Sequence, residues 1–153
     1  MDERPLGVMK SVEETLAELA DREAIRELPR LYCHYLWTQD PERMANLFTE
    51  DATICIEGME DYAITGRDKL AKVFRRVNAK YATQPFIHNH LVELTGPDRA
   101  TGVAYYEILE AREEQRYLAA GFYRDEYRKV GGEWKFQYRK IHMVTEFDSP
   151  PEM

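Results

Sequence analysis

The stretch GFYRDEYRKVGGEWKFQYRK, residues 121–140, decides the fold of this chain. Two runs in which aromatic residues alternate with charged ones lie on either side of Gly131 and Gly132. A Gly-Gly pair between two such runs is a hairpin signal, because a two-residue turn needs the positive φ angles that glycine adopts easily. The stretch therefore predicts two long antiparallel strands.

Two more strands are predicted before this hairpin. The segment FIHNHLVEL (86–94) is followed by a turn at Gly96-Pro97-Asp98, and RATGVAYYEILEA (99–111) comes next. The last strand continues as EWKFQYRKIHMVTEF (133–147). Long strands joined by short turns predict an antiparallel sheet in the second half of the chain.

The first half has helical periodicity. Ser11 and Glu14 have the spacing of a capping box, which begins a helix. Apolar residues then recur at helical intervals at Leu16, Leu19, Ile25, Leu28, Leu31, Tyr32 and Tyr35. Asp21 is a candidate cap of a second segment, and Pro29 is expected to kink the helix or end it early.

Three shorter elements follow. Asp40 and Pro41 have the residue types of an N-cap and first helical position. The segment 52–57 (ATICIE) predicts a β-branched strand, and 66–81 predicts a helix. The buried face of this helix is expected to carry Leu70, Val73, Phe74 and Val77. Helices followed by strands predict an α+β fold, with a strongly curved, mostly antiparallel sheet wrapped on about three helices.

Composition narrows the functional classes. The 153 residues fit a single domain spanning 1–153, in which 1–10 and 148–153 are expected to be flexible tails. The net charge of −7 would repel a phosphate backbone, so we expect no nucleic-acid partner. We also expect no membrane span and no signal peptide. Cys33 and Cys55 form no disulfide framework, which predicts reduced thiols in a cytoplasmic protein.

The order of these segments resembles the SnoaL-like group of the nuclear transport factor 2 (NTF2-like) superfamily. The stretches that carry the resemblance are DREAIRELPRLYCHYL, LFTEDATICIEG, GRDKL, NHLVELTGPDRATG and GFYRDEYRKVGGEWKFQYRK, which together run from Asp21 to about His142. The resemblance implies an α+β cone in which helices close over a bent sheet and leave a pocket. It also implies a homodimer or homotrimer formed by the outer face of the sheet.

The resemblance also locates candidate catalytic residues. Tyr32 falls on the tyrosine position of the dehydratases in this group. Trp37 and Ile108 occupy positions where related enzymes carry acids, and Pro85 occupies the usual histidine position. Arg139 matches a pocket position that is arginine or neutral in the dehydrochlorinases, so it is our candidate to bind an anionic or carbonyl oxygen. Of the tyrosine, acid and histidine positions that carry the acid–base chemistry of these enzymes, only the tyrosine position keeps its residue type in this chain.

The orientation of His88 and His90 depends on the register of their strand. Simple alternation turns both histidines inward, whereas the register implied by the resemblance turns Asn89 inward. A single bulge between residues 85 and 90 would reconcile the two, and we expect at least one histidine to face the pocket. As a metal site the pair lacks a third ligand, so we expect no metal. A histidine near its ordinary pKa could instead act as a general base.

Two functional hypotheses follow. The first is a cofactor-independent lyase or isomerase acting on an apolar aromatic or polycyclic molecule, with Tyr32, His88 and His90 as catalytic candidates. Its expected substrate-binding residues are Trp37, Phe48, Ile54, Tyr62, Asn89, Tyr106, Ile108, Tyr123 and Arg139. No cofactor motif is visible in the sequence. The second is a non-catalytic module that binds a small molecule or another chain. A third, weaker possibility is a ring-hydroxylating dioxygenase β-type subunit, which would require a separate catalytic chain.

The cavity distinguishes these hypotheses. A cavity of roughly 300 Å³ or more, with a histidine within reach of Tyr32 or Asn89, would favour an enzyme. A closed cone filled by tyrosines would favour the binding module.

Overall fold

The computed structural model describes residues 9–80, 83–112 and 115–147. In chain order its elements are α1 (Val12–Trp37), α2 (Pro41–Asn46), β1 (Phe48–Ile56), the 3₁₀ helix η1 (Glu60–Tyr62), β2 (Ile64–Thr65), α3 (Arg67–Lys80), β3 (Thr83–Leu94), β4 (Arg99–Arg112), β5 (Gln115–Val130) and β6 (Glu133–Phe147). The predicted tails fall mainly on residues 1–8 and 148–153, which lie outside the described residues.

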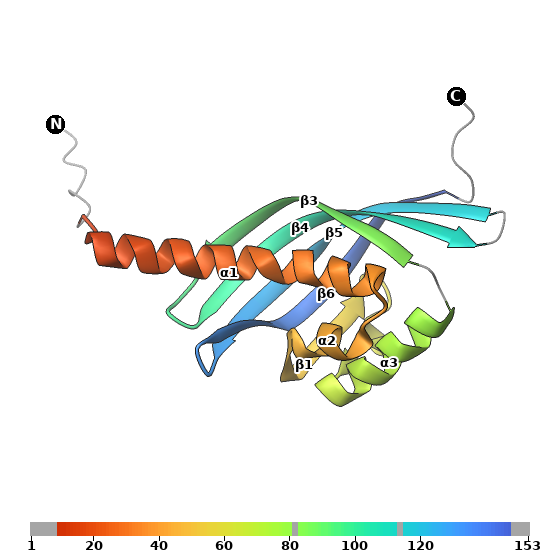
Figure 1. The fold of residues 1–153 in the computed structure, drawn as a ribbon, viewed down its shortest axis with the longest axis horizontal. Coiled ribbons are helices and arrows are strands. Elements are labelled where there is room, and N and C mark those ends of the chain that lie inside the picture. The colour runs from red at the N-terminus through yellow and green to blue at the C-terminus, as the bar shows by residue number, and fades with distance from the viewer. Residues whose placement is uncertain (1–8, 81–82, 113–114, 148–153) are drawn as a thin grey trace, which may run out of the picture.

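The six strands form one curved sheet in the order β2-β1-β6-β5-β4-β3. Strands β3 to β6 are joined as consecutive antiparallel neighbours. β1 pairs in parallel with β6 and antiparallel with β2, so the sheet is mixed. α1 lies across the concave face, and α2 and α3 lie beside β1 (Figure 1). This arrangement confirms the predicted α+β cone.

α1 begins where the sequence predicts, but it does not stop or divide. Ser11 and Glu14 form the expected capping box. The helix then continues through Pro29 to Trp37, so the expected early end is wrong. Packing of the helix against β3 and β6 outweighs the backbone hydrogen bond that Pro29 cannot make. Asp21 caps nothing; its carboxylate accepts hydrogen bonds from Lys129 and Trp134.

The remaining local predictions are confirmed with small shifts in bounds. The Asp40 side chain caps α2, with Pro41 as its first residue. β1 begins at Phe48, four residues before the predicted strand. Gly131 and Gly132 have φ angles of 59° and 83°, the left-handed values that the β5–β6 turn requires.

Two groups of buried side chains line the concave face. The larger one joins α1, α2, α3 and the near half of the sheet, with Phe48, Phe74 and Phe136 at its centre. The smaller one consists of Ala104, Tyr106 and Tyr123, with Ile87, Ile108 and Ile141 packed against it. The first group packs the helices against the sheet. The second group packs on the concave face of β3 to β6, beyond the part that the helices cover.

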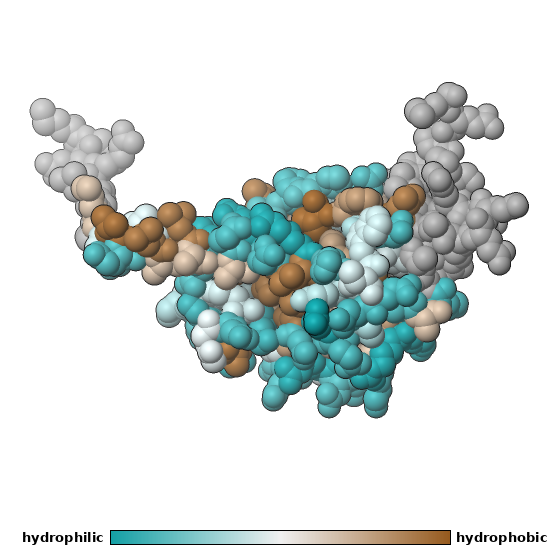
Figure 2. All heavy atoms as spheres, in the orientation of Figure 1, coloured by the Kyte–Doolittle hydropathy of each residue, from teal (hydrophilic) through white to brown (hydrophobic). Residues whose placement is uncertain are grey.

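The N-terminal part of α1 extends beyond the sheet (Figure 1). The periodicity of α1 predicts that Leu16 and Leu19 are buried with the rest of the stripe, but they are 60% and 56% exposed. Met9 and Val12 are also exposed, and Figure 2 shows apolar residues beside hydrophilic ones on this part of the helix. The buried stripe therefore begins only at Ile25.

Candidate functional site

An apolar cavity of about 270 Å³ lies between α1, α3 and the segment that joins β1 to β2. Its lining residues are Tyr32, Leu36, Met44, Ile54, Cys55, Ile56, Met59, Tyr62, Ile64, Leu70, Val73, Phe74, Val77 and Ile141. α3 contributes the side chains that its amphipathic sequence turns toward the sheet. Tyr62, 76% exposed, and Met59 place the mouth of the cavity at η1.

Tyr32 is the residue of α1 that joins the cavity to the polar interior. Its ring makes edge contacts with Phe48, Phe74, Tyr123 and Phe136 at centroid distances of 6.1 to 6.3 Å. Burial raises the pKa of its hydroxyl, and the nearby Arg139 guanidinium offsets part of this rise. Tyr32 is therefore a neutral phenol, which can donate a hydrogen bond but does not ionise at neutral pH.

Arg139 lies behind Tyr32 and is fully buried. Its Nε and Nη2 atoms each donate to an oxygen of Asp125 at 2.8 Å, a bidentate ion pair. The guanidinium carbon lies 4.0 to 4.5 Å from the ring centroids of Tyr32, Tyr123 and Phe136. Although burial opposes it, Asp125 raises the pKa of Arg139 above its usual value. The cavity lining does not include Arg139, so in this conformation it faces Asp125 rather than a ligand.

A hydrogen-bonded chain continues from this ion pair to His90. Tyr127 donates its hydroxyl proton to Asp125 Oδ2 at 3.0 Å, so its oxygen is left to accept. His90 Nε2 lies 3.0 Å from that oxygen and must donate, which leaves Nδ1 without a proton. Burial lowers the pKa of His90 to about 4, so the ring is neutral at pH 7. Within the described residues, Nδ1 is buried and makes no hydrogen bond.

Tyr106 and Tyr123 form a stacked pair next to this chain. Their ring centroids are 4.4 Å apart with an interplanar angle of 21°. The Tyr106 hydroxyl donates to the carbonyl of His142 at 3.3 Å. Burial raises the pKa of Tyr106 to about 12 and that of Tyr123 well above the ordinary value. Together with Tyr32 and Tyr127, the pair fills the concave face with neutral phenols.

The predicted bulge in β3 is present and separates the two histidines. The register against β4 shifts between Ile87 and His90. His90 follows the bulge on the concave side, where it meets Tyr127. His88 is exposed and lies 3.2 Å from Glu107, and Asn89 is also exposed. His90 thus points into the interior, but the cavity lining includes neither histidine, so the expected histidine in the pocket is not seen there.

The other predicted binding residues fall into three groups. Ile54 and Tyr62 join Tyr32 in the cavity. Ile108 packs against the Tyr106–Tyr123 pair, and Phe48 is a fully buried core residue. Trp37 is 43% exposed; its Nε1 donates to the carbonyl of Pro85 at 2.8 Å, and its ring contacts Phe86. Its contacts are thus with the start of β3, outside the cavity.

Asp125 was not predicted as a site residue, because it lies among charged residues that are typical of a solvent-exposed strand. The alternation of Tyr123, Asp125 and Tyr127 was the available signal, since it turns all three inward. Met44 and Met59 were also missed. They come from different segments whose meeting depends on how α2 and η1 pack, which local periodicity does not encode.

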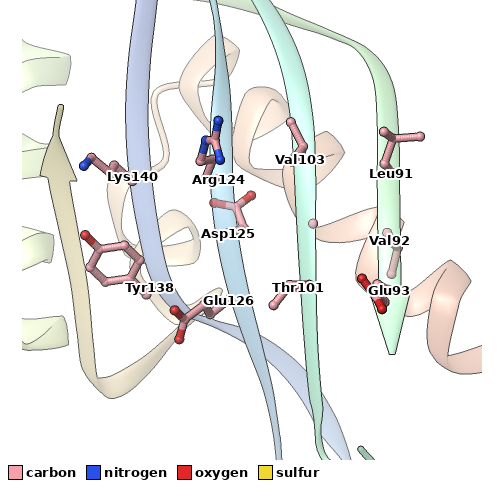
Figure 3. Close-up of a pocket in the computed structure, with 11 residues that line it drawn as sticks. Leu91, Val92, Glu93, Thr101, Val103, Arg124, Asp125, Glu126, Tyr138 and Lys140 are labelled. Carbon is pink, nitrogen blue, oxygen red and sulfur yellow. The ribbon is translucent and has the colours of Figure 1, made fainter. Parts of the chain in front are cut away.

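A larger but shallow groove of about 580 Å³ lies on the opposite face of the sheet. Figure 3 shows the side chains that line it along β3, β4, β5 and β6, with the helices behind the sheet. Across the groove from β3 to β6 the neighbours are Leu91, Val103, Arg124 and Lys140, with Tyr138 two residues before Lys140 on β6. We place the candidate site in the smaller cavity, because that cavity lies between elements and has an almost entirely apolar lining.

Two kinds of site are not found in the described part of the chain. Within residues 9–80, 83–112 and 115–147, no three His, Cys, Asp or Glu side chains are arranged to hold a metal ion. No helix in these ranges has the length and apolar character needed to cross a membrane.

Comparisons with known proteins agree with this architecture. Residues 17–140 match the model of the SnoaL-like domain. No curated protein sequence matches the chain. The structure is similar to a scytalone dehydratase-like protein from Novosphingobium aromaticivorans, at 23% identity and a TM-score of 0.79, over 90% of this chain and 93% of that one.

Two further solved structures are similar. The LinA-type3 hexachlorocyclohexane dehydrochlorinase from Novosphingobium barchaimii has 22% identity and a TM-score of 0.78, over 90% of this chain and 96% of that one. A protein of unknown function from Mycobacterium tuberculosis has 27% identity and a TM-score of 0.76, over 90% and 78% of the two chains.

Proposed function

Because the chain belongs to the SnoaL-like domain family, we propose that it binds an apolar small molecule in the cavity beneath α3 and converts it as a cofactor-independent lyase or isomerase. The observation that carries this proposal is the apolar cavity with the Tyr32 phenol in its wall. The dehydratase-like and dehydrochlorinase structures of the same fold support the choice of a lyase-type reaction.

Tyr32 is the proposed hydrogen-bond donor to a carbonyl or leaving oxygen. A phenol kept neutral by burial donates to an oxygen that gains negative charge during the reaction. An apolar wall strengthens such a contact, because water does not compete for it. His90 is the proposed base, since its Nδ1 carries a free lone pair. Its ring lies outside the cavity lining, so this role requires the substrate to extend from the cavity toward the concave face of β3, and its pKa of about 4 makes it a weak base. His88 is the weaker candidate, because it is exposed and paired with Glu107.

Substitution tests the two roles. With a substrate in hand, Tyr32→Phe and His90→Gln are each expected to lower kcat by about 10²-fold. His88→Gln is the matched control for His90 and is expected to retain most of the activity. Full activity in both Tyr32→Phe and His90→Gln would contradict the assignment. Circular dichroism of each variant checks that the fold is intact.

A non-catalytic binding module is the second candidate. Two observations favour it: the cavity, at about 270 Å³, is below the roughly 300 Å³ expected of an enzyme, and its described lining contains no imidazole or carboxylate. Tyrosines and the Arg139–Asp125 pair also fill part of the concave face of the sheet. Incubation of the protein with a bound ligand, followed by mass spectrometry, distinguishes the two. Binding without conversion favours the module, and conversion favours the enzyme.

We also propose that the outer face of the sheet joins copies of this chain into a homodimer or homotrimer. Leu91 is 62% exposed on this face, and Tyr105 is also exposed there. The shallow groove in Figure 3 lies at the same place. Exposed apolar side chains on an open sheet are typical of an interface.

A further inference from the structure

Two stacked tyrosines of the sheet, Tyr123 and Tyr106, lie behind the inner end of the cavity. Tyr32 and Ile141 form this end of the lining. Tyr123 lies directly behind both residues: its ring meets Tyr32 at 6.1 Å, and it pairs with Ile141 across β5 and β6. Tyr106 stacks on the far side of Tyr123. From the mouth inward, the cavity lining therefore comes first, then Tyr123 and then Tyr106.

The two rings are held firmly. The Tyr106 hydroxyl donates to the His142 carbonyl, and Tyr123 covers the Arg139 guanidinium at 4.0 Å. Gly121 provides the room for Tyr106, since a Cβ atom at that position would lie 2.8 Å from the Tyr106 hydroxyl and 2.0 Å from the His142 carbonyl oxygen. A substitution at Gly121 would push the plug out of place.

We propose that Tyr106 and Tyr123 act as a plug that sets the size of the ligand, so that the cavity accepts an uncharged molecule of one or two rings and excludes skeletons of four rings. The inference rests on the proposed function in one respect, that the cavity is the ligand site. It narrows the substrate class, which the sequence left open between aromatic and polycyclic molecules.

The volume supports this limit. At the packing density of protein interiors, about 0.75, a cavity of 270 Å³ holds a ligand with a van der Waals volume of about 200 Å³. That is roughly a two-ring skeleton with a few substituents, and a four-ring steroid exceeds it by about half. A larger molecule would have to leave its excess in solvent beyond Met59 and Tyr62.

The lining supports the absence of charge. Its polar side chains are the two phenols of Tyr32 and Tyr62 and the thiol of Cys55. Cys55 Sγ lies 2.9 Å from the Tyr138 hydroxyl, so the thiol already has a hydrogen-bond partner within the protein. Arg139 is a buried cation near the cavity but not part of its lining; Asp125 pairs with its Nε and Nη2 and balances its charge, while its buried Nη1 has no hydrogen-bond partner among the described residues. An ionised ligand would lose its hydration without gaining a partner, which is costly.

Isothermal titration calorimetry with three compounds tests the proposal: 2-naphthol, its charged analogue 2-naphthoate, and the steroid progesterone. Wild-type protein is expected to bind 2-naphthol at least tenfold more tightly than either of the others. Tyr106→Ala is expected to bind progesterone at least tenfold more tightly than wild type does, because Tyr123 can then lean into the vacated space. Tyr105→Ala removes a ring from the opposite, outer face of the sheet and is the matched control for ligand binding; because that face is the proposed interface between copies, light scattering checks that the assembly of this variant matches wild type.

The outcomes separate the two ideas. If wild type binds progesterone as tightly as 2-naphthol, the plug is overturned while the cavity remains the ligand site. If Tyr106→Ala folds, as judged by circular dichroism, and gains no progesterone binding, the plug is also overturned. Should Tyr106→Ala fail to fold, Tyr123→Leu removes the other ring and is judged by the same gain. Absence of binding by every compound to every variant overturns the proposed function and the plug together.

Discussion

At the scale of single residues, the most consequential pair is Asp125 and Arg139. Both side chains are fully buried, and they neutralise each other through two short hydrogen bonds. Removing one partner of such a pair leaves a buried charge without compensation. The pair therefore fixes how the tyrosines around Arg139 are arranged, and it makes the interior intolerant of isosteric changes at position 125.

The first prediction concerns this pair. Asp125→Asn is expected to lower the free energy of unfolding by about 3–5 kcal/mol, because Arg139 stays charged and buried. Urea denaturation followed by circular dichroism measures the loss. Glu126→Gln, at the adjacent exposed position, is the matched control and is expected to change stability by less than about 0.5 kcal/mol. Equal effects of the two substitutions would contradict the role assigned to the ion pair.

A second residue-scale prediction concerns pH. Burial holds His90 at a pKa of about 4, against an ordinary value of 6.5. Between these values the unfolded chain binds more protons at this position, so the free energy of unfolding falls as the pH decreases through this window. The contribution of His90 to this loss is on the order of 2–3 kcal/mol.

The measurement is urea denaturation at pH 7, 6, 5 and 4.5 for wild type and His90→Gln. His90→Gln is expected to show a shallower decline with acid than wild type. Identical slopes for wild type and His90→Gln would show that His90 is not held neutral by burial.

At the scale of elements, the bulge in β3 decides which histidine enters the interior. Simple alternation turned both histidines inward, whereas the register implied by the resemblance turned Asn89 inward. The bulge between Ile87 and His90 reconciles the two registers. A sequence can show that two registers conflict, but the position of an extra residue depends on pairing with β4. Pro29 is a second case in which tertiary packing decides the outcome: α1 continues through this residue although proline disfavours a helix interior.

The β5–β6 turn gives the element-scale prediction. Gly132 has a φ angle of 83°, which an L-residue with a side chain adopts only with strain. Gly132→Ala is therefore expected to destabilise the protein by about 1 kcal/mol. Gly96→Ala is the matched control, because Gly96 has no positive φ and a Cβ atom there meets open space. Thermal denaturation of both variants tests the difference, and equal melting temperatures would contradict it.

At the scale of the molecule, the order of segments was sufficient for the architecture but not for the site. The resemblance predicted the cone, and the structure confirms it. Of the predicted site residues, the structure brings Tyr32, Ile54 and Tyr62 together in the lining of one cavity. Asp125 and the methionines of the lining were missed, because burial of a charge and the meeting of distant segments are properties of the packed whole.

The molecule-scale prediction concerns assembly. Size-exclusion chromatography with light scattering is expected to show a dimer or trimer. Leu91→Lys, on the outer face of the sheet, is expected to shift the population toward monomer, because it places a charge in the proposed interface. Leu16→Lys is the matched control, since Leu16 is similarly exposed but lies on the projecting part of α1. A wild-type monomer at all concentrations would contradict the proposal.

The parallel pairing of β1 with β6 has a consequence for how the protein is made. β1 leaves the ribosome some eighty residues before β6. Until then it can pair only with the two-residue strand β2, so its other edge stays open. Ile54 and Ile56 meet their β6 partners only when synthesis is nearly finished. The floor of the cavity is thus among the last parts to form during translation, and the nascent chain presents an apolar edge that a chaperone could bind.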